Sequence, residues 1–179
     1  MLRYGRANFT AFCSLGIALI GLASLGVGAA LAGVRINTSF SLPLGLYVRT
    51  SDPHAQLIEF CPIEPFAHES SVRGYRTRGT ACPDGAVPLL KPVVAGPGDR
   101  VVLSADGIIV NGRLLPQTAP LARDARGRRL RSWPLGTYVV ASATFWVAST
   151  YNRGSYDSRY MGPIKAGQIR ARLRPLWLL

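Results

Sequence analysis

The sequence has few of the residues on which most hydrolases and metalloenzymes depend. It has two histidines, His54 and His68, which are isolated from each other and lie in no Ser/His/Asp triad motif. Its three cysteines form neither a CxxC pair nor a Cys/His cluster with the spacing of a zinc site. The sequence therefore predicts no metal site, and we expect no cofactor.

Acidic residues and lysines are scarce as well. Lys and Arg total 21 against 9 for Asp and Glu, a formal net charge of +12, and only two of these cations, Lys91 and Lys165, are lysines. Such a charge favours an anionic partner, either lipid headgroups or nucleic acid. No nucleic-acid-binding motif with interleaved aromatic residues is present, so we expect no specific nucleic-acid partner. The five arginines of residues 122–132 favour a solvated surface loop, with a contact to lipid or nucleic acid as the alternative.

Charge is absent from one long stretch near the N-terminus. Residues 7–34 carry no charged side chain and exceed the roughly 20 apolar residues that span a bilayer. We predict a short cytoplasmic N-terminus at 1–6, a single transmembrane anchor at 7–34 and an exported domain at 35–179, on the periplasmic side of the inner membrane. The alternative is a secretory signal cleaved near residues 30–32, but the run is longer than the ~7–15 residues of a signal core.

The exported part has the pattern of a mainly β domain. Beyond residue 47, short β-branched and apolar runs alternate with turns that contain Gly, Pro, Asp or Asn. Asp106-Gly107 and Asn111-Gly112 are each placed to turn the chain, which predicts a hairpin at residues 105–115.

One segment departs from this rhythm. Residues 62–82 are polar and have no continuous apolar run, which predicts an excursion, a segment that leaves the β domain and returns to it. Cys61 and Cys82 flank it, and an oxidising compartment allows these thiols to form a disulfide. The sequence alone does not bring their α-carbons within range, so the pairing stays open.

Three hydroxyl residues follow the predicted anchor and precede a turn at residues 43–45. They are Thr38, Ser39 and Ser41. Such a stretch is either an ordinary juxtamembrane linker or a nucleophile held at the bilayer surface.

A lysine is the residue that would activate such a serine. Burial in apolar surroundings favours the neutral amine, which then serves as a base. Lys91 lies in the apolar stretch AVPLLKPVV, whereas Lys165 follows a Gly-Pro turn and is expected to be exposed. Lys91 is therefore either a strand-edge charge or a general base.

Three segments occur in order behind the predicted anchor: NTSFSLPLGLY at 37–47, LLKPVVAGPGDRV at 89–101 and NRGSYDSRYMGPI at 152–164. Each motif alone is weak, but the three in this order resemble the boxes of type I signal peptidases. They are most similar to those of the TraF-type conjugative transfer peptidases. The resemblance covers the layout of the whole chain and implies a signal-peptidase-like β domain behind one transmembrane helix.

The resemblance also implies roles for individual residues. In the conjugative branch the nucleophile lies in a Ser-x-Pro-x-Gly-Leu-Tyr setting, which maps onto Ser41. Typical signal peptidases have one more residue before the proline, so Ser39 is the alternative. In the preferred register, Ser39 supplies a hydroxyl that helps the nucleophile's backbone N–H to bind the oxyanion. The family's general base, a lysine ahead of a Gly-x-Pro-Gly-Asp turn, maps onto Lys91.

The last of the three segments supplies supporting residues by the same resemblance. In signal peptidases a serine at this position hydrogen-bonds and orients the lysine, and Ser155 occupies its place. Asp157 and Arg159 match an acidic and a basic residue of the same box, for which a supporting, structure-holding role and a chemical role both stay open. The alternative for these two residues, an ion pair at the surface near a turn, stays open.

The function that the resemblance implies is a membrane-anchored serine endopeptidase with a Ser/Lys dyad. It would process the leader of an exported precursor, a conjugative pilin precursor by similarity to the TraF branch, in contact with the lipid bilayer and other conjugation or secretion components. Hydrolysis and cyclisation of the product both stay open. Alternatives are a general housekeeping signal peptidase and a non-catalytic, basic membrane component of a conjugation or secretion channel.

Overall fold

The computed structural model describes residues 33–179 and eight helical residues before them. These are Leu15, Gly16, Leu19, Gly21, Ala23, Ser24, Gly26 and Gly28. The chain divides into two units, residues 1–35 and 36–179. The predicted anchor lies mostly outside the described residues, and no helix within them has the length and hydropathy to cross a bilayer. The folded unit that follows carries all the features considered below.

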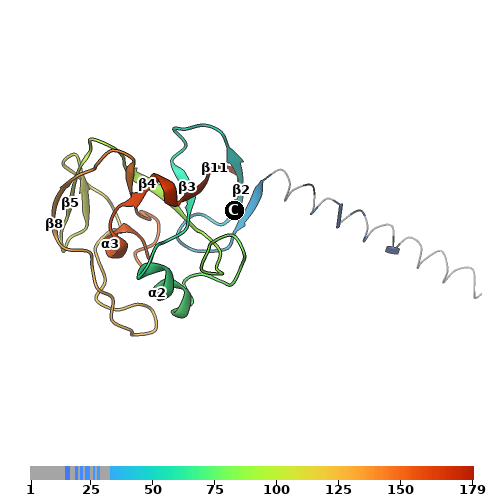
Figure 1. Ribbon diagram of the computed structural model, residues 1–179, viewed down its shortest axis with the longest axis horizontal. Helices are drawn as coiled ribbons and strands as arrows, with labels where there is room; N and C mark the ends of the chain where they lie inside the picture. The colour runs from blue at the N-terminus through green and yellow to red at the C-terminus, as the bar shows by residue number, and fades with distance from the viewer. Residues whose placement is uncertain are drawn as a thin grey trace, which may run out of the picture. The chain divides into compact units, whose positions relative to one another are not determined.

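Two β-sheets form the body of this unit (Figure 1). The large sheet has the order β1 (Val34–Asn37), β2 (Gly45–Thr50), β11 (Ile169–Leu178), β3 (Leu57–Phe60), β4 (Leu89–Ala95), β9 (Thr144–Val147) and β10 (Ile164–Lys165). The small sheet has the order β7 (Arg113–Leu114), β6 (Ile108–Val110), β5 (Arg100–Leu103) and β8 (Gly136–Val139). The pairings from β2 to β10 and throughout the small sheet are antiparallel. The prediction of a mainly β domain is confirmed.

Helices are short and lie at the ends of strands or in connections. They are α2 (Phe66–Val72), α3 (Ser158–Met161) and the 3-10 turn η1 (Ala166–Gln168). The predicted hairpin is present as β6 and β7, with Gly107 ahead of it and Asn111-Gly112 at its turn. Gly107 has a φ of 140°, and a Cβ there would lie 2.6 Å from Oγ1 of Thr118, so this turn requires glycine.

The face of β4 that points inward sets the position of the lysine. Side chains alternate between the two faces of a strand. Leu89 and Lys91 are therefore on one face, and both are buried. Leu89 belongs to a hydrophobic cluster with Ile58, Phe60 and Val147, from β3 and β9. The strand thus carries Lys91 into the interior together with apolar neighbours.

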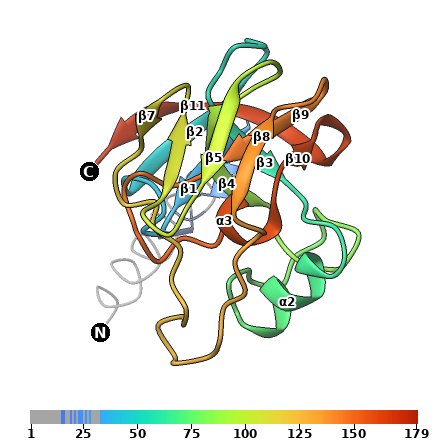
Figure 2. The same ribbon diagram turned by 90° about the vertical axis from the view of Figure 1, so that its left-hand side faces the viewer.

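The excursion after β3 is closed and packed against the domain. Cys61 and Cys82 form a disulfide across it. Helix α2 and the arginine-rich loop at 122–132 lie side by side (Figures 1 and 2), and Tyr75 donates a hydrogen bond to Asp124 between them. The arginine-rich loop is thereby a docked hairpin, bridged at Arg123 and Arg129.

Candidate active site

Lys91 is almost completely enclosed, with 4% of its surface exposed, and its amine lies against a hydroxyl. Its Nζ hydrogen-bonds Oγ of Ser41 at 2.6 Å. Burial lowers the pKa of Lys91 from 10.5 to about 8, while Asp157 raises this pKa and Arg159 lowers it by their charges. A lysine with this pKa is neutral in a useful fraction of molecules near neutral pH, as a general base must be.

Ser41 lies in the loop between β1 and β2, which Asn37 holds from inside. The buried Asn37 amide donates to the carbonyl oxygens of Ser39, Leu42 and Pro43 at 3.0–3.3 Å. Tyr47 donates its hydroxyl hydrogen to the carbonyl of Pro43 at 2.7 Å. The loop is therefore built from a dense set of internal hydrogen bonds, and it leaves Ser41 half-buried at the site.

The C-terminal strand fixes the far end of this loop. Gly45 begins β2 with a φ of 149°, where a Cβ would run into the carbonyl oxygen of Trp177 and lie 2.9 Å from Cα of Leu178. The backbone N–H of Leu179 donates to the carbonyl of Leu44 at 2.9 Å. Only a glycine allows β11 to approach the chain this closely directly after the Ser41 loop.

Ser39 lies in the same loop, but its hydroxyl hydrogen-bonds Asn37 and not Lys91. Its hydroxyl and its backbone N–H both donate to Oδ1 of Asn37, at 3.0 and 3.2 Å. Of the two serines between which the sequence left the choice open, Ser41 is the one whose Oγ hydrogen-bonds the lysine. Within residues 33–179, no group accepts a hydrogen bond from the backbone N–H of Ser41. This N–H is thus available to a ligand.

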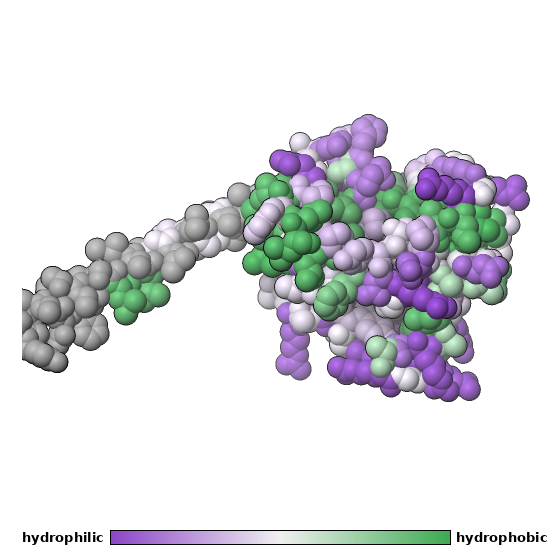
Figure 3. Space-filling model, turned by 180° about the vertical axis from the view of Figure 1, so that it is seen from behind, coloured by the Kyte–Doolittle hydropathy of each residue, from purple (hydrophilic) through white to green (hydrophobic). Residues whose placement is uncertain are grey.

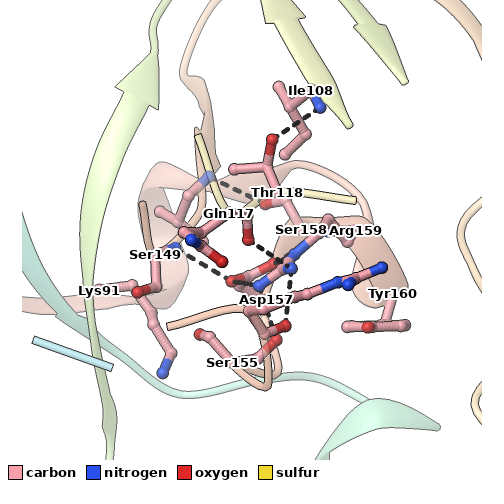
Figure 4. A network of polar contacts seen from close by, with 12 residues as sticks. Lys91, Ile108, Gln117, Thr118, Ser149, Ser155, Asp157, Ser158, Arg159 and Tyr160 are labelled. Carbon is pink, nitrogen blue, oxygen red and sulfur yellow. Dashed lines mark hydrogen bonds and ion pairs between the residues drawn. The ribbon is translucent and has the colours of Figure 1, made fainter. Parts of the chain in front are cut away.

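Asp157 and Arg159 form an ion pair in the interior, so the surface-pair alternative is wrong. Both side chains are fully buried, and the guanidinium binds the carboxylate through two hydrogen bonds of 2.8 Å (Figure 4). Nη1 of Arg159 donates to the carbonyls of Gln117 and Arg153, and Nη2 to that of Ser155. A buried charge pair with all its hydrogen bonds made holds several chain segments in one arrangement.

Ser155 is buried beside this pair, but its hydroxyl makes no hydrogen bond. Its Oγ has no partner among the described residues, so the bond to Lys91 that the family resemblance implies is not formed here. Its backbone carbonyl does accept a hydrogen bond from Arg159 at 2.9 Å. The residue is held in place through its main chain while its side chain stays unsatisfied.

Sequence reasoning missed one residue that contacts the Ser41 loop. Ser149, which is fully buried after β9, donates its hydroxyl hydrogen to the backbone carbonyl of Ser41 at 2.6 Å. Its own N–H donates to Oδ2 of Asp157 at 3.1 Å (Figure 4). No motif marks this position, because a serine at the end of an apolar strand is common in any β domain.

Comparisons with known proteins match most of the chain. Residues 51–177 match the family model described as signal peptidase, peptidase S26, a range that includes Lys91 and Ser155 to Arg159 but not Ser41. A plasmid transfer protein TraF of Escherichia coli is 35% identical over 166 residues, which cover 90% of this chain and 93% of that protein. A probable conjugal transfer protein TraF of Sinorhizobium fredii (strain NBRC 101917 / NGR234) is 38% identical, over 87% of this chain and 84% of that protein.

Among solved structures, a signal peptidase I from Enterococcus faecalis V583 is 18% identical and has a TM-score of 0.38. The matched region covers 69% of this chain and 98% of the signal peptidase chain.

Proposed function

Since the chain belongs to the signal peptidase family, peptidase S26, we propose that it is a membrane-anchored serine endopeptidase with Ser41 as nucleophile and Lys91 as general base. One observation carries this proposal: Nζ of a buried lysine lies 2.6 Å from Oγ of a serine whose loop is held by hydrogen bonds from Asn37 and Tyr47. A serine with an adjacent neutral base is the arrangement that nucleophilic catalysis requires.

The reaction follows from this pair. Neutral Lys91 takes the Ser41 proton as Oγ bonds to the scissile carbonyl carbon, and the carbonyl oxygen becomes an oxyanion. The backbone N–H of Ser41, which donates to no group within residues 33–179, is one proposed donor to it. The Ser39 hydroxyl is the second, once its hydrogen turns from Oδ1 of Asn37 to the oxyanion. The tetrahedral intermediate then expels the amine, which takes the proton from Lys91. Water or a second amine then attacks the carbonyl carbon of the acyl-enzyme and gives its proton to Lys91. Lys91 passes this proton to Oγ of Ser41 as the bond between Oγ and the acyl group breaks, and the product is released.

The proposed substrate is an exported precursor of a conjugation system, a pilin precursor. The support is the similarity to relatives named plasmid transfer protein and conjugal transfer protein. If water resolves the acyl-enzyme, the product is a linear chain. If the amine at the other end of the same product attacks, the product is a ring that is lighter by one water.

The proposed place of action is the outer surface of the inner membrane, with residues 7–34 as anchor. Large apolar side chains gather on one face of the domain (Figure 3). We define the apolar surface as Ile36, Phe40, Leu176, Trp177, Leu178 and Leu179, which are 43–80% exposed. These residues flank the Ser41 loop, so contact of this surface with lipid would hold the nucleophile at the depth where a membrane-bound precursor emerges.

The test uses membranes that contain the full-length protein and the pilin precursor of its conjugation system. Processing by wild type is compared with Ser41→Ala, Lys91→Ala and Ser39→Ala, by the mass of the product. We expect the first two variants to abolish processing at normal protein levels and Ser39→Ala to slow it about 10²- to 10³-fold at most, as for loss of one oxyanion donor. Loss with Ser39→Ala alone would move the nucleophile to Ser39.

Two further outcomes address the alternatives. Normal processing by all three variants would exclude a peptidase and favour the non-catalytic channel component. Cleavage of unrelated exported precursors at equal rates would favour the housekeeping signal peptidase.

A further inference from the structure

We infer that Ser149 is a positioning residue of this active site, which sets the orientation of Ser41 by holding its main chain. The inference rests on the proposed function and adds a residue that the family motifs do not contain. Ser149 would touch no substrate. It would act through the backbone carbonyl of Ser41, which accepts the Ser149 hydroxyl at 2.6 Å.

All hydrogen-bonding capacity of the Ser149 hydroxyl is used. A serine hydroxyl has one hydrogen to donate and two lone pairs to accept with. Its hydrogen goes to Ser41, and its oxygen accepts from the backbone N–H groups of Tyr151 and Asn152, at 3.1 and 2.9 Å. The hydroxyl therefore has one orientation, and this orientation points its hydrogen at the nucleophile's main chain.

Ser149 is itself anchored to the buried ion pair. Its N–H donates to Asp157, whose carboxylate is locked by Arg159. Figure 4 shows the carboxylate of Asp157 between Ser149 and the guanidinium. The supporting pair, whose role the sequence left open, thus reaches Ser41 through a chain of hydrogen bonds.

The same pair of strands supplies both contacts to Ser41. Lys91 lies on β4, and Ser149 comes two residues after the end of β9, which pairs with β4 at Val93 and Val147. The N–H of Ala148 also donates to the carbonyl of Pro92 at 3.1 Å. Two neighbouring strands therefore hold one residue, β4 by its side chain and the end of β9 by its main chain.

This two-point attachment bears directly on the reaction. With the carbonyl and the Oγ of Ser41 both fixed, the rotation of its side chain is fixed as well, while its N–H stays free for the oxyanion. A misplacement of reacting atoms by ~1 Å costs up to ~10²-fold in rate. Removing the Ser149 hydroxyl should therefore lower kcat more than it changes KM.

The experiment compares Ser149→Ala with Ser70→Ala in the full-length protein in membranes. Ser70 is the matched control, since it is also a fully buried serine whose hydroxyl bridges main-chain and side-chain groups, on α2. We expect Ser149→Ala to lower kcat for the pilin precursor about 10- to 100-fold with KM within twofold of wild type. Ser70→Ala should leave kcat within twofold, even if both variants unfold at a lower temperature.

A second measurement needs no substrate. Ser41→Cys, in a chain with Cys13→Ser, carries one free thiol beside Lys91, and its alkylation by iodoacetamide is followed against pH. Lysine at hydrogen-bond distance favours the thiolate, so the midpoint should lie below the ordinary thiol pKa of about 8.5. Adding Ser149→Ala should raise this midpoint, and adding Ser70→Ala should not.

The outcomes separate the two proposals. An unchanged thiol midpoint and an unchanged kcat in Ser149→Ala would overturn the positioning role while leaving the peptidase in place. Equal losses of kcat in Ser149→Ala and Ser70→Ala would assign Ser149 a purely structural role. Processing by Ser41→Ala would overturn the peptidase, and the thiol midpoint would still report whether Ser149 holds residue 41.

Discussion

At the scale of single residues, the burial of Lys91 predicts the pH dependence of the reaction. Its pKa of about 8 means that the neutral base becomes more abundant with rising pH. We expect the single-turnover rate of precursor processing to rise about tenfold per pH unit below pH 8 and to level off above it. Rates measured from pH 6 to 9.5 test this. Ser39→Ala should lower the rate without moving the midpoint, and a flat profile would exclude Lys91 as the base.

The same burial predicts that the lysine is costly for the fold. Its pKa is 10.5 when unfolded and about 8 when folded, so the folded state binds fewer protons between these values. The loss of folding stability that the burial of Lys91 causes is fully present below pH 8, and it disappears as the pH rises toward 10.5. Lys91→Met should therefore raise the free energy of unfolding at pH 7 by on the order of 2 kcal/mol, after loss of the bond to Ser41.

Denaturant unfolding of the wild type and of Lys91→Met at pH 7 and pH 10.5 measures this effect. The advantage of the variant should shrink at the higher pH. Lys165→Met is the control, because that lysine is exposed and its replacement should change neither value. A variant less stable than wild type at pH 7 would show that Lys91 is not buried in apolar surroundings.

The sequence pointed to some of the residues that meet in the structure and not to others. Ser41 and Lys91 stood out because few other groups are present that can do such chemistry, and because each lies in a recognisable short motif. Ser149 did not, since its partner, Ser41, lies far away in the sequence and only the packing of β9 against β4 brings the two together. The burial of Asp157 and Arg159 could not be predicted for the same reason, because the local sequence does not show which distant segments pack over a charged side chain.

At the scale of elements, the pairing of β2 with β11 should control the Ser41 loop. Gly45→Ala would place a Cβ against Trp177 and force a residue with a side chain to a φ of 149°. We expect it to separate the start of β2 from β11, to lower the free energy of unfolding by about 1–3 kcal/mol and to reduce processing. Thermal unfolding and the processing assay measure both effects.

Gly167→Ala is the control for this prediction. Gly167 lies in η1, has an ordinary φ, and nothing lies within 4 Å of the position that a Cβ would take. Its replacement should leave stability and processing within error of the wild type. Equal behaviour of Gly45→Ala and Gly167→Ala would show that the close approach of β11 does not matter for the loop.

Some strands and helices, like some residues, could be predicted from the local sequence, and others could not. Strands β3, β5, β6, β8 and β9 were visible as short β-branched and apolar runs between turns, because local composition and turn chemistry determine them. The sequence did not show where the loop ends and strand β2 begins, because the partner strand β11 is distant in the sequence. Helix α2 was read as part of a broken excursion, because its seven residues are too few for a clear helical pattern.

At the scale of the whole domain, the large sheet brings the site together at one place. The proposed nucleophile comes from the loop between β1 and β2, and the proposed base from β4. The residues that support them come from the end of β9 through α3. Strand β11 lies between β2 and β3, so the C-terminal residues, which form part of the apolar surface, also contact the Ser41 loop. A perturbation of this surface can therefore act on the reaction without touching its chemistry.

Contact of the apolar surface with lipid can be tested directly. Trp177→Ser with Leu179→Ser removes two large side chains that are 62% and 80% exposed, so little packing is lost. The bond from the Leu179 N–H to Leu44 is a main-chain bond and survives the change. If the surface rests on lipid, processing of the precursor in membranes should fall severalfold at an unchanged thermal unfolding temperature.

The control pair is Leu135→Ser with Val139→Ser, which removes side chains that are 58% and 72% exposed near the small sheet. This pair also removes exposed apolar side chains, but at β8, which lies at the opposite end of the domain from β2 (Figure 1), so its processing rate should match the wild type. Equal rates for both double variants would mean that exposed apolar side chains near the C-terminus serve no membrane contact. A loss with the first pair that disappears when both proteins are assayed in detergent would locate the effect at the bilayer, because the intact Ser41 and Lys91 remain able to react there.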